Sequence, residues 1–193
     1  TVHGVTIYNP SKDPKGPNTD GINPSSCRNV RISDCFISVG DDCITIKSGR
    51  DADGRKYGKA CENITITNCV MLSGHGGVVI GSEMSGGVRR VTISNCVFDG
   101  TDSGIRLKSS RGRGGVVEEL RVDNIVMKNI QRNAFIFDLF YDKESKMEPV
   151  SERTPVFRNI HLSNITGSDI KQIGYIKGIE EMPVQGLSFS NIN

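Results

Sequence analysis

Hydrophobic and polar residues alternate in seven short segments of the chain, and one pattern recurs in all of them. An aliphatic, a polar, an aliphatic and a polar residue are followed by Asn or Asp and a small residue. The segments are GVTIYNP (4–10), NVRISDC (29–35), NITITNC (63–69), RVTISNC (90–96), ELRVDNI (119–125), NIHLSNI (159–165) and GLSFSNI (186–192). The alternation and the β-branched content predict that each segment is a β-strand.

The spacing of these strands predicts a solenoid. The first aliphatic residues of the segments are Val5, Val30, Ile64, Val91, Leu120, Ile160 and Leu187. The steps between them are 25, 34, 27, 29, 40 and 27 residues. A base unit of roughly 25 residues with loop insertions is too short for most helical repeats and is typical of β-solenoids.

The residue that ends each strand predicts a corner of the solenoid. Asn and Asp tolerate unusual turn dihedrals, and an Asn amide can bond to the same residue one coil away. We therefore expect a ladder at this corner made of Asn9, Asp34, Asn68, Asn95, Asn124, Asn164 and Asn191.

A second strand is predicted after most of the first ones, at 20–25, 42–48, 76–82, 103–109 and 134–139. A doubly wound α/β fold is the structural alternative, but it needs crossover helices, and no window keeps a period of 3.6 residues. We therefore expect an all-β fold, a right-handed single-stranded parallel β-helix of about seven turns. One domain is expected over 1–193.

The composition agrees with this fold and excludes some functions. The chain has 22 Gly, 6% aromatic residues and no Trp, which suits a narrow interior filled by aliphatic ladders. The net charge of +2 excludes a strongly basic nucleic-acid binder. No apolar run is long enough to cross a membrane.

Six cysteines follow the repeat rather than a metal or redox motif. Cys35, Cys69 and Cys96 occupy one position in three consecutive units, and Cys27 matches Cys61. Parallel side chains one coil apart rarely meet the torsion that a disulfide requires. We expect a buried ladder of small apolar residues, with disulfides as the alternative, and no zinc spacing is present.

Alignment of the second strands places acidic and basic residues on one strip. Asp20 and Asp42 share one position, and Asp41, His75 and Asp102 share the neighbouring one. Ile22, Ile44, Val78 and Ile105 then stack in the core, and the residues expected to point outward are Thr45, Val79 and Arg106, followed by Lys47, Gly81 and Lys108. Stacked carboxylates repel, which separates their proton affinities and suits acid–base catalysis.

Each of these residues also has a non-catalytic interpretation. An Asp-Asp pair can be a solvated turn or a calcium site, and His75 between glycines can be an ordinary loop residue. Flanking glycines can instead allow a ligand to approach the backbone. Arg106 and Lys108 can form a solvated strand face, but beside carboxylates they are better read as binders of an anionic substrate.

Four short motifs carry a resemblance to a known family. In order along the chain they are Asn18-Thr19-Asp20, Gly40-Asp41-Asp42, Gly74-His75-Gly76 and Arg106-Leu107-Lys108. Together they resemble the signature motifs of the polygalacturonases, glycoside hydrolase family 28, in which Ile is more usual than Leu107. The segments 80–88 and 111–115 are more similar to bacterial and exo-acting members.

The resemblance implies a role for each motif residue. Asp41 would be the general acid, Asp20 and Asp42 would hold and activate the attacking water, and His75 would tune the acid or shape the site. Substrate contacts are implied for Asn18, Arg106, Lys108 and Tyr141, with positioning of a neighbouring residue as the alternative for Asn18 and core packing as the alternative for Tyr141. The family inverts the anomeric centre.

The chain also departs from the family pattern. Fungal members have a disulfide from the Cys after Asp-Asp, whereas 71–73 here hold no cysteine, so a reduced Cys43 is expected. Family catalytic domains are commonly much longer. We therefore expect a fragment, truncated at the N-terminal end, with truncation at the C-terminal end as an open alternative.

The resulting expectation is an inverting hydrolase of α-1,4-galacturonosyl linkages in pectin, endo- or exo-acting. A calcium-dependent pectate lyase and a non-catalytic pectin-binding solenoid are the alternatives. No cofactor, metal, nucleic acid or membrane partner is expected, and a capped full-length domain is expected to be a monomer. The resemblance implies a secreted or periplasmic enzyme.

Overall fold

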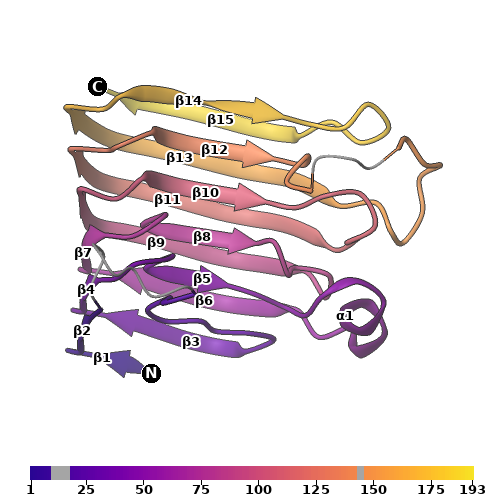
Figure 1. Cartoon of the computed structure of the whole chain (residues 1–193), viewed down its shortest axis with the longest axis horizontal. Coiled ribbons are helices and arrows are strands. Elements are labelled where there is room, and N and C mark those ends of the chain that lie inside the picture. Colours follow the sequence, from indigo (N-terminus) through magenta and orange to yellow (C-terminus); the bar gives the residue numbers. More distant parts are fainter. Residues whose placement is uncertain (10–17, 143–145) are drawn as a thin grey trace.

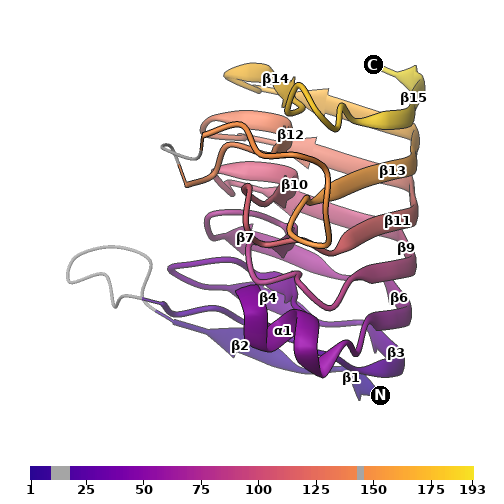
Figure 2. The ribbon, with the colours of Figure 1, turned by 90° about the vertical axis from the view of Figure 1, so that its right-hand side faces the viewer.

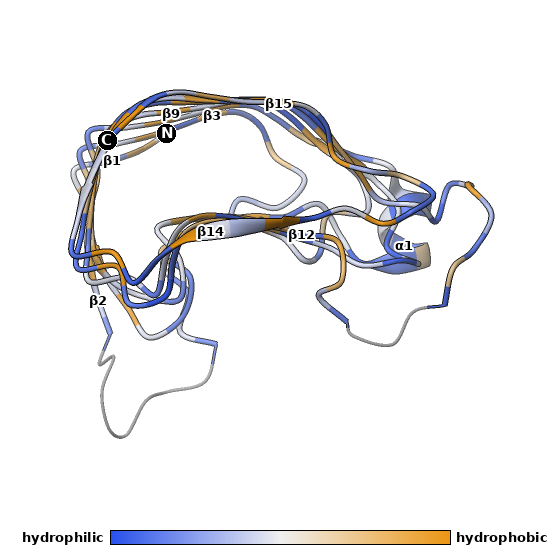
Figure 3. Ribbon diagram, turned by 90° about the horizontal axis from the view of Figure 1, so that it is seen from above, coloured by the Kyte–Doolittle hydropathy of each residue, from blue (hydrophilic) through white to orange (hydrophobic). Residues whose placement is uncertain are grey.

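The computed structural model describes residues 1–9, 18–142 and 146–193. The chain forms a stack of coils that rises from the N-terminus to the C-terminus (Figure 1), and the side view shows successive coils lying directly above one another (Figure 2). Seen from the C-terminal end, the chain turns counterclockwise as it approaches the viewer (Figure 3). The fold is therefore the predicted right-handed parallel β-helix.

Two parallel sheets form the walls of the solenoid. The ten strands of the larger sheet are β1 (Val2–His3), β2 (Thr6–Tyr8), β3 (Arg28–Ser33), β4 (Phe36–Ser38), β6 (Cys61–Thr67), β7 (Val70–Ser73), β9 (Val88–Asp99), β11 (Val116–Lys128), β13 (Val156–Ser168) and β15 (Gln185–Ile192). The five strands of the smaller sheet are β5 (Ile44–Ile46), β8 (Val78–Gly81), β10 (Ser103–Lys108), β12 (Asn133–Asp138) and β14 (Gln172–Lys177).

The register of the larger sheet confirms the repeat for six of the seven segments. The pairs Val30–Ile64, Ile64–Val91, Val91–Leu120, Leu120–Ile160 and Ile160–Leu187 all lie opposite one another. The placement of the first segment was wrong. Thr6 pairs with Phe36, so segment 4–10 matches the stretch after the corner, and Val2 occupies the expected strand by pairing with Ile32.

The predicted corner ladder is present, and its residues adopt the left-handed backbone conformation. Its residues have φ between 50° and 57°, and they are Asp34, Asn68, Asn95, Asn124, Asn164 and Asn191. Asn124 Nδ2 donates to Asn95 Oδ1 over 2.7 Å, and Asn191 Nδ2 donates to Asn164 Oδ1 over 2.7 Å. In the first coil the register puts Gly4, with φ of 63°, at this corner in place of the predicted Asn9. Glycine fills the position because it meets no steric penalty there.

Aliphatic ladders fill the interior, and the cysteines belong to one of them. Cys35, Cys69 and Cys96 are buried, and all six cysteines carry free thiols. Ile125 continues their ladder, because it pairs with Cys96. Burial raises the pKa of Cys61 to about 11, which keeps this thiol protonated. The predicted apolar cysteine ladder is confirmed.

A short helix, α1 (Asp51–Tyr57), interrupts the loop between β5 and β6. It has seven residues and ends at Gly58, which has φ of 61°. Such a short helix shows no sustained period in the sequence, so it was not predicted. Among the described residues, no helix has the length and apolar character that crossing a membrane requires.

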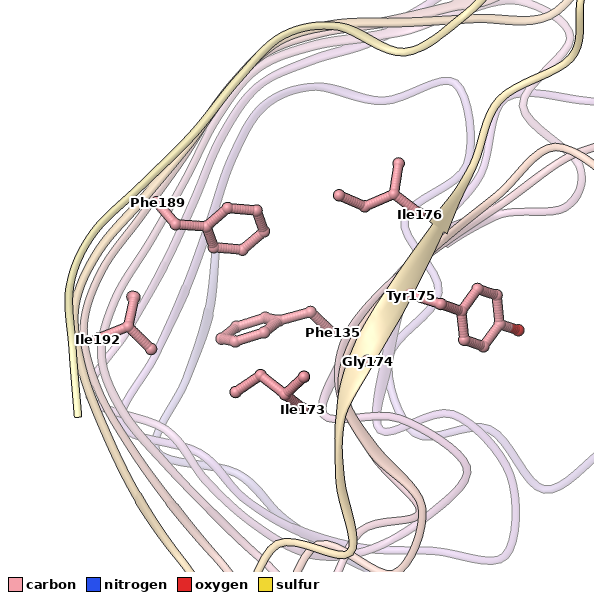
Figure 4. A pocket seen from close by; sticks show the side chains of 7 residues that line it. All are labelled: Phe135, Ile173, Gly174, Tyr175, Ile176, Phe189 and Ile192. Carbon is pink, nitrogen blue, oxygen red and sulfur yellow. The ribbon is translucent and has the colours of Figure 1, made fainter.

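The interior is open at the C-terminal coil. A hollow of about 660 Å³ lies between the two walls there, and Phe135, Ile173, Phe189 and Ile192 point into it (Figure 4). Ile176 also points into the interior, whereas Tyr175, its neighbour on the same strand, points away from it. Successive side chains of a strand face opposite sides, and this separates the apolar hollow from the outer face of the smaller sheet.

Candidate active site

The candidate site lies on the outer face of the smaller sheet. Ile44 pairs with Val78, and Val78 pairs with Ile105. Ile22 forms a bridge with Ile44 one level below. This register confirms that Asp20 aligns with Asp42, and that Asp41 aligns with His75.

The candidate acid, Asp41, is hydrogen-bonded to the residue with which it aligns. His75 Nδ1 lies 3.0 Å from Asp41 Oδ1, and the Asp42 amide donates to the same oxygen over 2.9 Å. The His75 amide also donates to the Asp41 carbonyl oxygen over 2.9 Å. These bonds fix the orientation of the carboxyl group, which remains partly open to solvent.

Each of the other two aspartates is paired with a lysine. Lys108 Nζ lies 2.9 Å from Asp42 Oδ2, and both side chains are almost fully buried. Lys47 Nζ lies 3.3 Å from Asp20 Oδ2, to which Asn23 Nδ2 also donates over 2.9 Å. The other Asp42 oxygen, Oδ1, is buried and has no hydrogen-bond partner within the described part of the chain.

The sequence indicated where Lys47 lies but not what it does. Lys47, Gly81 and Lys108 share one position in the sheet, so the pairing of Lys108 with a carboxylate could have suggested the same for Lys47. Asn23 was not considered at all. It follows Asp20 by three residues, and no pattern in the sequence distinguishes it from other loop asparagines.

Arg106 and Lys108 lie next to an aromatic ring. The Arg106 guanidinium carbon is 5.7 Å and Lys108 Nζ is 5.3 Å from the centre of the Tyr141 ring. Tyr141 is partly exposed and lines a hollow together with His75 and Arg106. Its alternative placement in the core was wrong, because β12 ends before it and the chain turns outward.

The expected exposure of the strip was wrong for several of its residues, because Asp42, Thr45, Val79, Gly81 and Lys108 are buried. Thr45 and Val79 point outward from their strands but are fully buried. A Cβ atom on Gly76 would lie within 2.4 Å of Val79 Cγ2, so the loop that carries His75 packs directly over Val79.

The glycines beside His75 are required by packing of the protein itself. A Cβ on Gly74, which has φ of 147°, would lie 2.5 Å from the Asp41 carbonyl oxygen and 2.8 Å from Cys43 Sγ. A Cβ on Gly77 would meet the Phe98 ring at 2.9 Å. These contacts, rather than the approach of a ligand, explain why the loop contains glycine.

Cys43 is free and buried, as expected. Its Sγ donates to the Ser73 carbonyl oxygen over 3.0 Å. Burial is the largest cause that raises the pKa of the Cys43 thiol. The group is therefore a structural element beneath the site and not a nucleophile.

Asn18 is exposed, and its backbone has φ of 52°. Its predicted contact with a sugar or a neighbouring residue stays a prediction. The backbone of the same motif is fixed, because the Asp41 amide donates to the Thr19 carbonyl oxygen over 3.4 Å.

Three side chains could hold a metal ion. Potential ligand atoms of Asp41, Asp42 and His75 all lie within 4.8 Å of one another. Calcium takes six to eight oxygen ligands, whereas this group supplies two carboxylates and an imidazole. Lys108 beside Asp42 places a positive charge at the same position, so the arrangement fits acid–base chemistry better than a calcium site.

The chain is similar to characterised proteins over its full length. Residues 1–193 match the family model described as Glycosyl hydrolases family 28. A probable polygalacturonase from Vitis vinifera is 35% identical over 192 residues, which are 99% of this chain and 38% of that protein. An endo-polygalacturonase from Pectobacterium carotovorum subsp. carotovorum is 35% identical over 178 residues, which are 92% of this chain and 40% of that protein.

Solved structures have the same overall fold as this chain. The hyperthermoactive exopolygalacturonase from Thermotoga maritima superimposes with a TM-score of 0.89 at 35% identity, covering 99% of this chain and 44% of that one. The polygalacturonase from Erwinia carotovora ssp. carotovora gives 0.71 at 28% identity, covering 99% and 50%. The chain thus spans about two fifths of the length of the curated relatives above.

Proposed function

The chain belongs to family 28 of the glycosyl hydrolases, and on that premise we propose that it hydrolyses α-1,4-galacturonosyl linkages in pectin by an inverting acid/base mechanism. Residues 1–193 are part of its catalytic β-helix domain. The observation that carries the proposal is the unequal pairing of the three aspartates, because two are bound to lysines and one to a histidine.

Asp41 is the general acid in this proposal. Within the described part of the chain, its side-chain carboxyl bonds to His75 and to a backbone amide rather than to a lysine. Its side chain, at 21% exposed, is the most accessible of the three aspartates, which lets it reach the glycosidic oxygen of a bound substrate, and His75 orients it.

Asp20 and Asp42 bind and activate the attacking water. Lys47 and Lys108 each form an ion pair with one oxygen of these carboxyl groups, which fixes the orientation of both groups towards the water. The buried Asp42 Oδ1 has no partner within the described residues, and a buried polar atom of this kind normally binds water. A water at that oxygen also lies near Asp20, which occupies the same position one coil below.

Arg106, Lys108 and Tyr141 bind the sugar beside the scissile bond. A guanidinium forms paired hydrogen bonds with a carboxylate, and Arg106 Nε is buried without a partner in the described part. The Tyr141 ring borders both cations and supplies a flat surface for the sugar. Asn18, at the edge of the site, contacts either the sugar or a catalytic neighbour.

The proposed partner is a pectic polysaccharide, and neither nucleic acid nor a membrane takes part. Because this substrate is a cell-wall polymer, the protein acts outside the cytoplasm, either secreted or periplasmic. The comparisons include both endo- and exo-acting polygalacturonases. Chromatography of the products distinguishes them, because an exo enzyme releases monomer alone from the start.

Incubation with polygalacturonate tests the function. We expect new reducing ends, no ultraviolet-absorbing product and no effect of a chelator, because the proposed chemistry needs no metal. An unsaturated product whose formation stops with a chelator would establish a calcium-dependent lyase instead. Binding of oligogalacturonate without any cleavage would identify a non-catalytic pectin-binding solenoid.

A further inference from the structure

The hollow beside Arg106 extends well beyond the residues that have been assigned a role. It has a volume of about 400 Å³, and the residues that line it include Asp102, Arg106, Arg132, Ile136, Tyr141 and Tyr175. Arg106 pairs with Ile136, and Ile136 pairs with Tyr175. The hollow therefore continues for two coils past Arg106, on the side away from Asp20.

Arg132 is the most available cation of this hollow. It aligns with Asp102 one coil below, and its contact with that carboxylate is long, because Nε lies 3.7 Å from Asp102 Oδ2. Its side chain is 73% exposed. On the larger sheet, by contrast, Arg89 Nε lies 2.6 Å from Glu62, and Arg158 NH2 lies 2.7 Å from Glu118. A loosely paired arginine within a hollow is suited to an anionic ligand.

The Tyr175 ring lines the hollow on the side away from Arg106, and its orientation is fixed by two contacts. Its ring points away from the apolar interior (Figure 4), and its hydroxyl donates to Asp138 Oδ2 over 3.1 Å. Lys177 Nζ lies 4.9 Å from the centre of the same ring. The ring is held at both its edge and its face, and it is partly exposed. A fixed aromatic surface with a few polar groups is typical of a small-ligand site.

Charge changes sign along the outer face of the smaller sheet. The lower coils carry Asp20, Asp41, Asp42 and Glu83 against Lys47, whereas the upper coils carry Arg106, Lys108, Arg132, Lys171 and Lys177 against Asp102 and Asp138. Strands one level apart are separated by about 4.8 Å, a spacing that lets successive units of an extended polyanion meet successive coils.

We propose that this hollow binds a second uronate unit of the substrate, one unit beyond the sugar held by Arg106. Its carboxylate binds Arg132, and its ring lies between Tyr141 and Tyr175. This inference rests on the proposed function, and it assigns Arg132 and Tyr175 to substrate binding on the Arg106 side of the catalytic aspartates.

Hydrolysis of di-, tri- and tetragalacturonate by the Arg132→Gln variant tests the proposal. We expect KM for the tri- and tetramer to rise about tenfold, which corresponds to the loss of one charge-assisted hydrogen bond. KM for the dimer should change less than about twofold, because a dimer can span the scissile bond without reaching Arg132. Arg132→Lys should recover part of the loss.

Arg31→Gln is the matched control, because Arg31 is an exposed arginine on the larger sheet. Equal KM values for Arg132→Gln and the wild-type protein at every length would overturn the inference and leave the hydrolase function standing. A rise in KM for the dimer as large as that for the tri- and tetramer would also overturn it, because Arg132 would then act at the first sugar. Failure of the wild-type protein to cleave both polygalacturonate and all three oligomers would refute the proposed function itself, and the inference with it.

Discussion

Lys108 Nζ lies 2.9 Å from Asp42 Oδ2, although 66 residues separate the two side chains in the sequence. Gly76 and Gly81 occupy the corresponding positions on the intervening strand level. Neither has a side chain, which leaves the space between the lysine and the aspartate open. A residue that a motif identifies as a substrate binder is thus also the counter-ion of a candidate catalytic carboxylate.

Lys108→Met should destabilise the fold as well as abolish activity. The substitution leaves the buried Asp42 carboxylate without its cation, and breaking a buried ion pair costs about 3 kcal/mol. Urea unfolding of the variant measures the loss. The double variant Asp42→Asn/Lys108→Met removes both charges and should recover a large part of it. A single variant within about 0.5 kcal/mol of wild type would show that the pair contributes no stability.

Asp41→Asn should lower kcat at least about a hundredfold, because a general acid contributes that much or more to the rate. The fold should keep its stability, since the partly exposed side chain keeps a hydrogen bond to His75. Turnover of polygalacturonate and urea unfolding measure the two effects. Asp53→Asn, on the exposed face of α1, is the control for the loss of one carboxylate. Near-normal turnover of Asp41→Asn would refute the assignment of the acid.

The ion pair between Arg111 and Glu181 should make stability depend on acidic pH. The two side chains are nearly buried, and the hydrogen bond from Arg111 lowers the pKa of Glu181 from 4.5 to about 2. The unfolded state therefore takes up the proton first. The contribution of the pair is complete above a pH of about 4.5 and declines as the pH falls towards about 2.

Glu181→Gln should accordingly lower the free energy of unfolding by about 3 kcal/mol at neutral pH. Its difference from the wild-type free energy of unfolding should shrink below a pH of about 4.5. Urea unfolding at a series of pH values measures this trend. Glu180→Gln changes the neighbouring exposed carboxylate and should show almost no difference. A Glu181→Gln deficit that stays constant down to the lowest pH would contradict the ion-pair explanation.

Asn124→Ala should destabilise the fold by about 1 to 2 kcal/mol, because an alanine pays the steric cost of a left-handed conformation and loses the bond to Asn95. Asn124→Gly should cost clearly less, since glycine adopts φ near 53° freely. Urea midpoints at unchanged m values compare the two variants. Equal losses would mean that the amide ladder, and not the backbone conformation, determines the effect.

Local patterns in the sequence predicted the solenoid and the alignment of the motifs. Alternation of aliphatic and polar residues defines a strand, and the repeated Asn or Asp defines a corner, so both depend on neighbours in the chain. The first coil was misplaced because Gly4 stands at the corner where the other coils have Asn or Asp. Segment 4–10 then imitates the repeat pattern five residues too late, because Gly4 rather than Asn9 aligns with Asp34.

The burial of Thr45 and Val79 could not be predicted in the same way. Alternation tells which face of a strand a side chain occupies, but not whether a loop covers that face. The loop of Gly74, Gly76 and Gly77 lies over the strand because these glycines pack against Asp41, Val79 and Phe98. Such contacts depend on distances between different coils.

The sequence by itself determined the fold class, the position of the first strand of each repeat from residue 29 onwards and the grouping of Asp20, Asp41, Asp42 and His75. These follow from periods and registers, which a linear chain encodes directly. The tertiary structure alone decided which cation pairs with which aspartate, that Tyr141 faces Arg106 and Lys108, and that the hollow reaches Arg132 and Tyr175. Long side chains such as Lys47 and Lys108 can reach several neighbours, and the choice among them depends on three-dimensional packing.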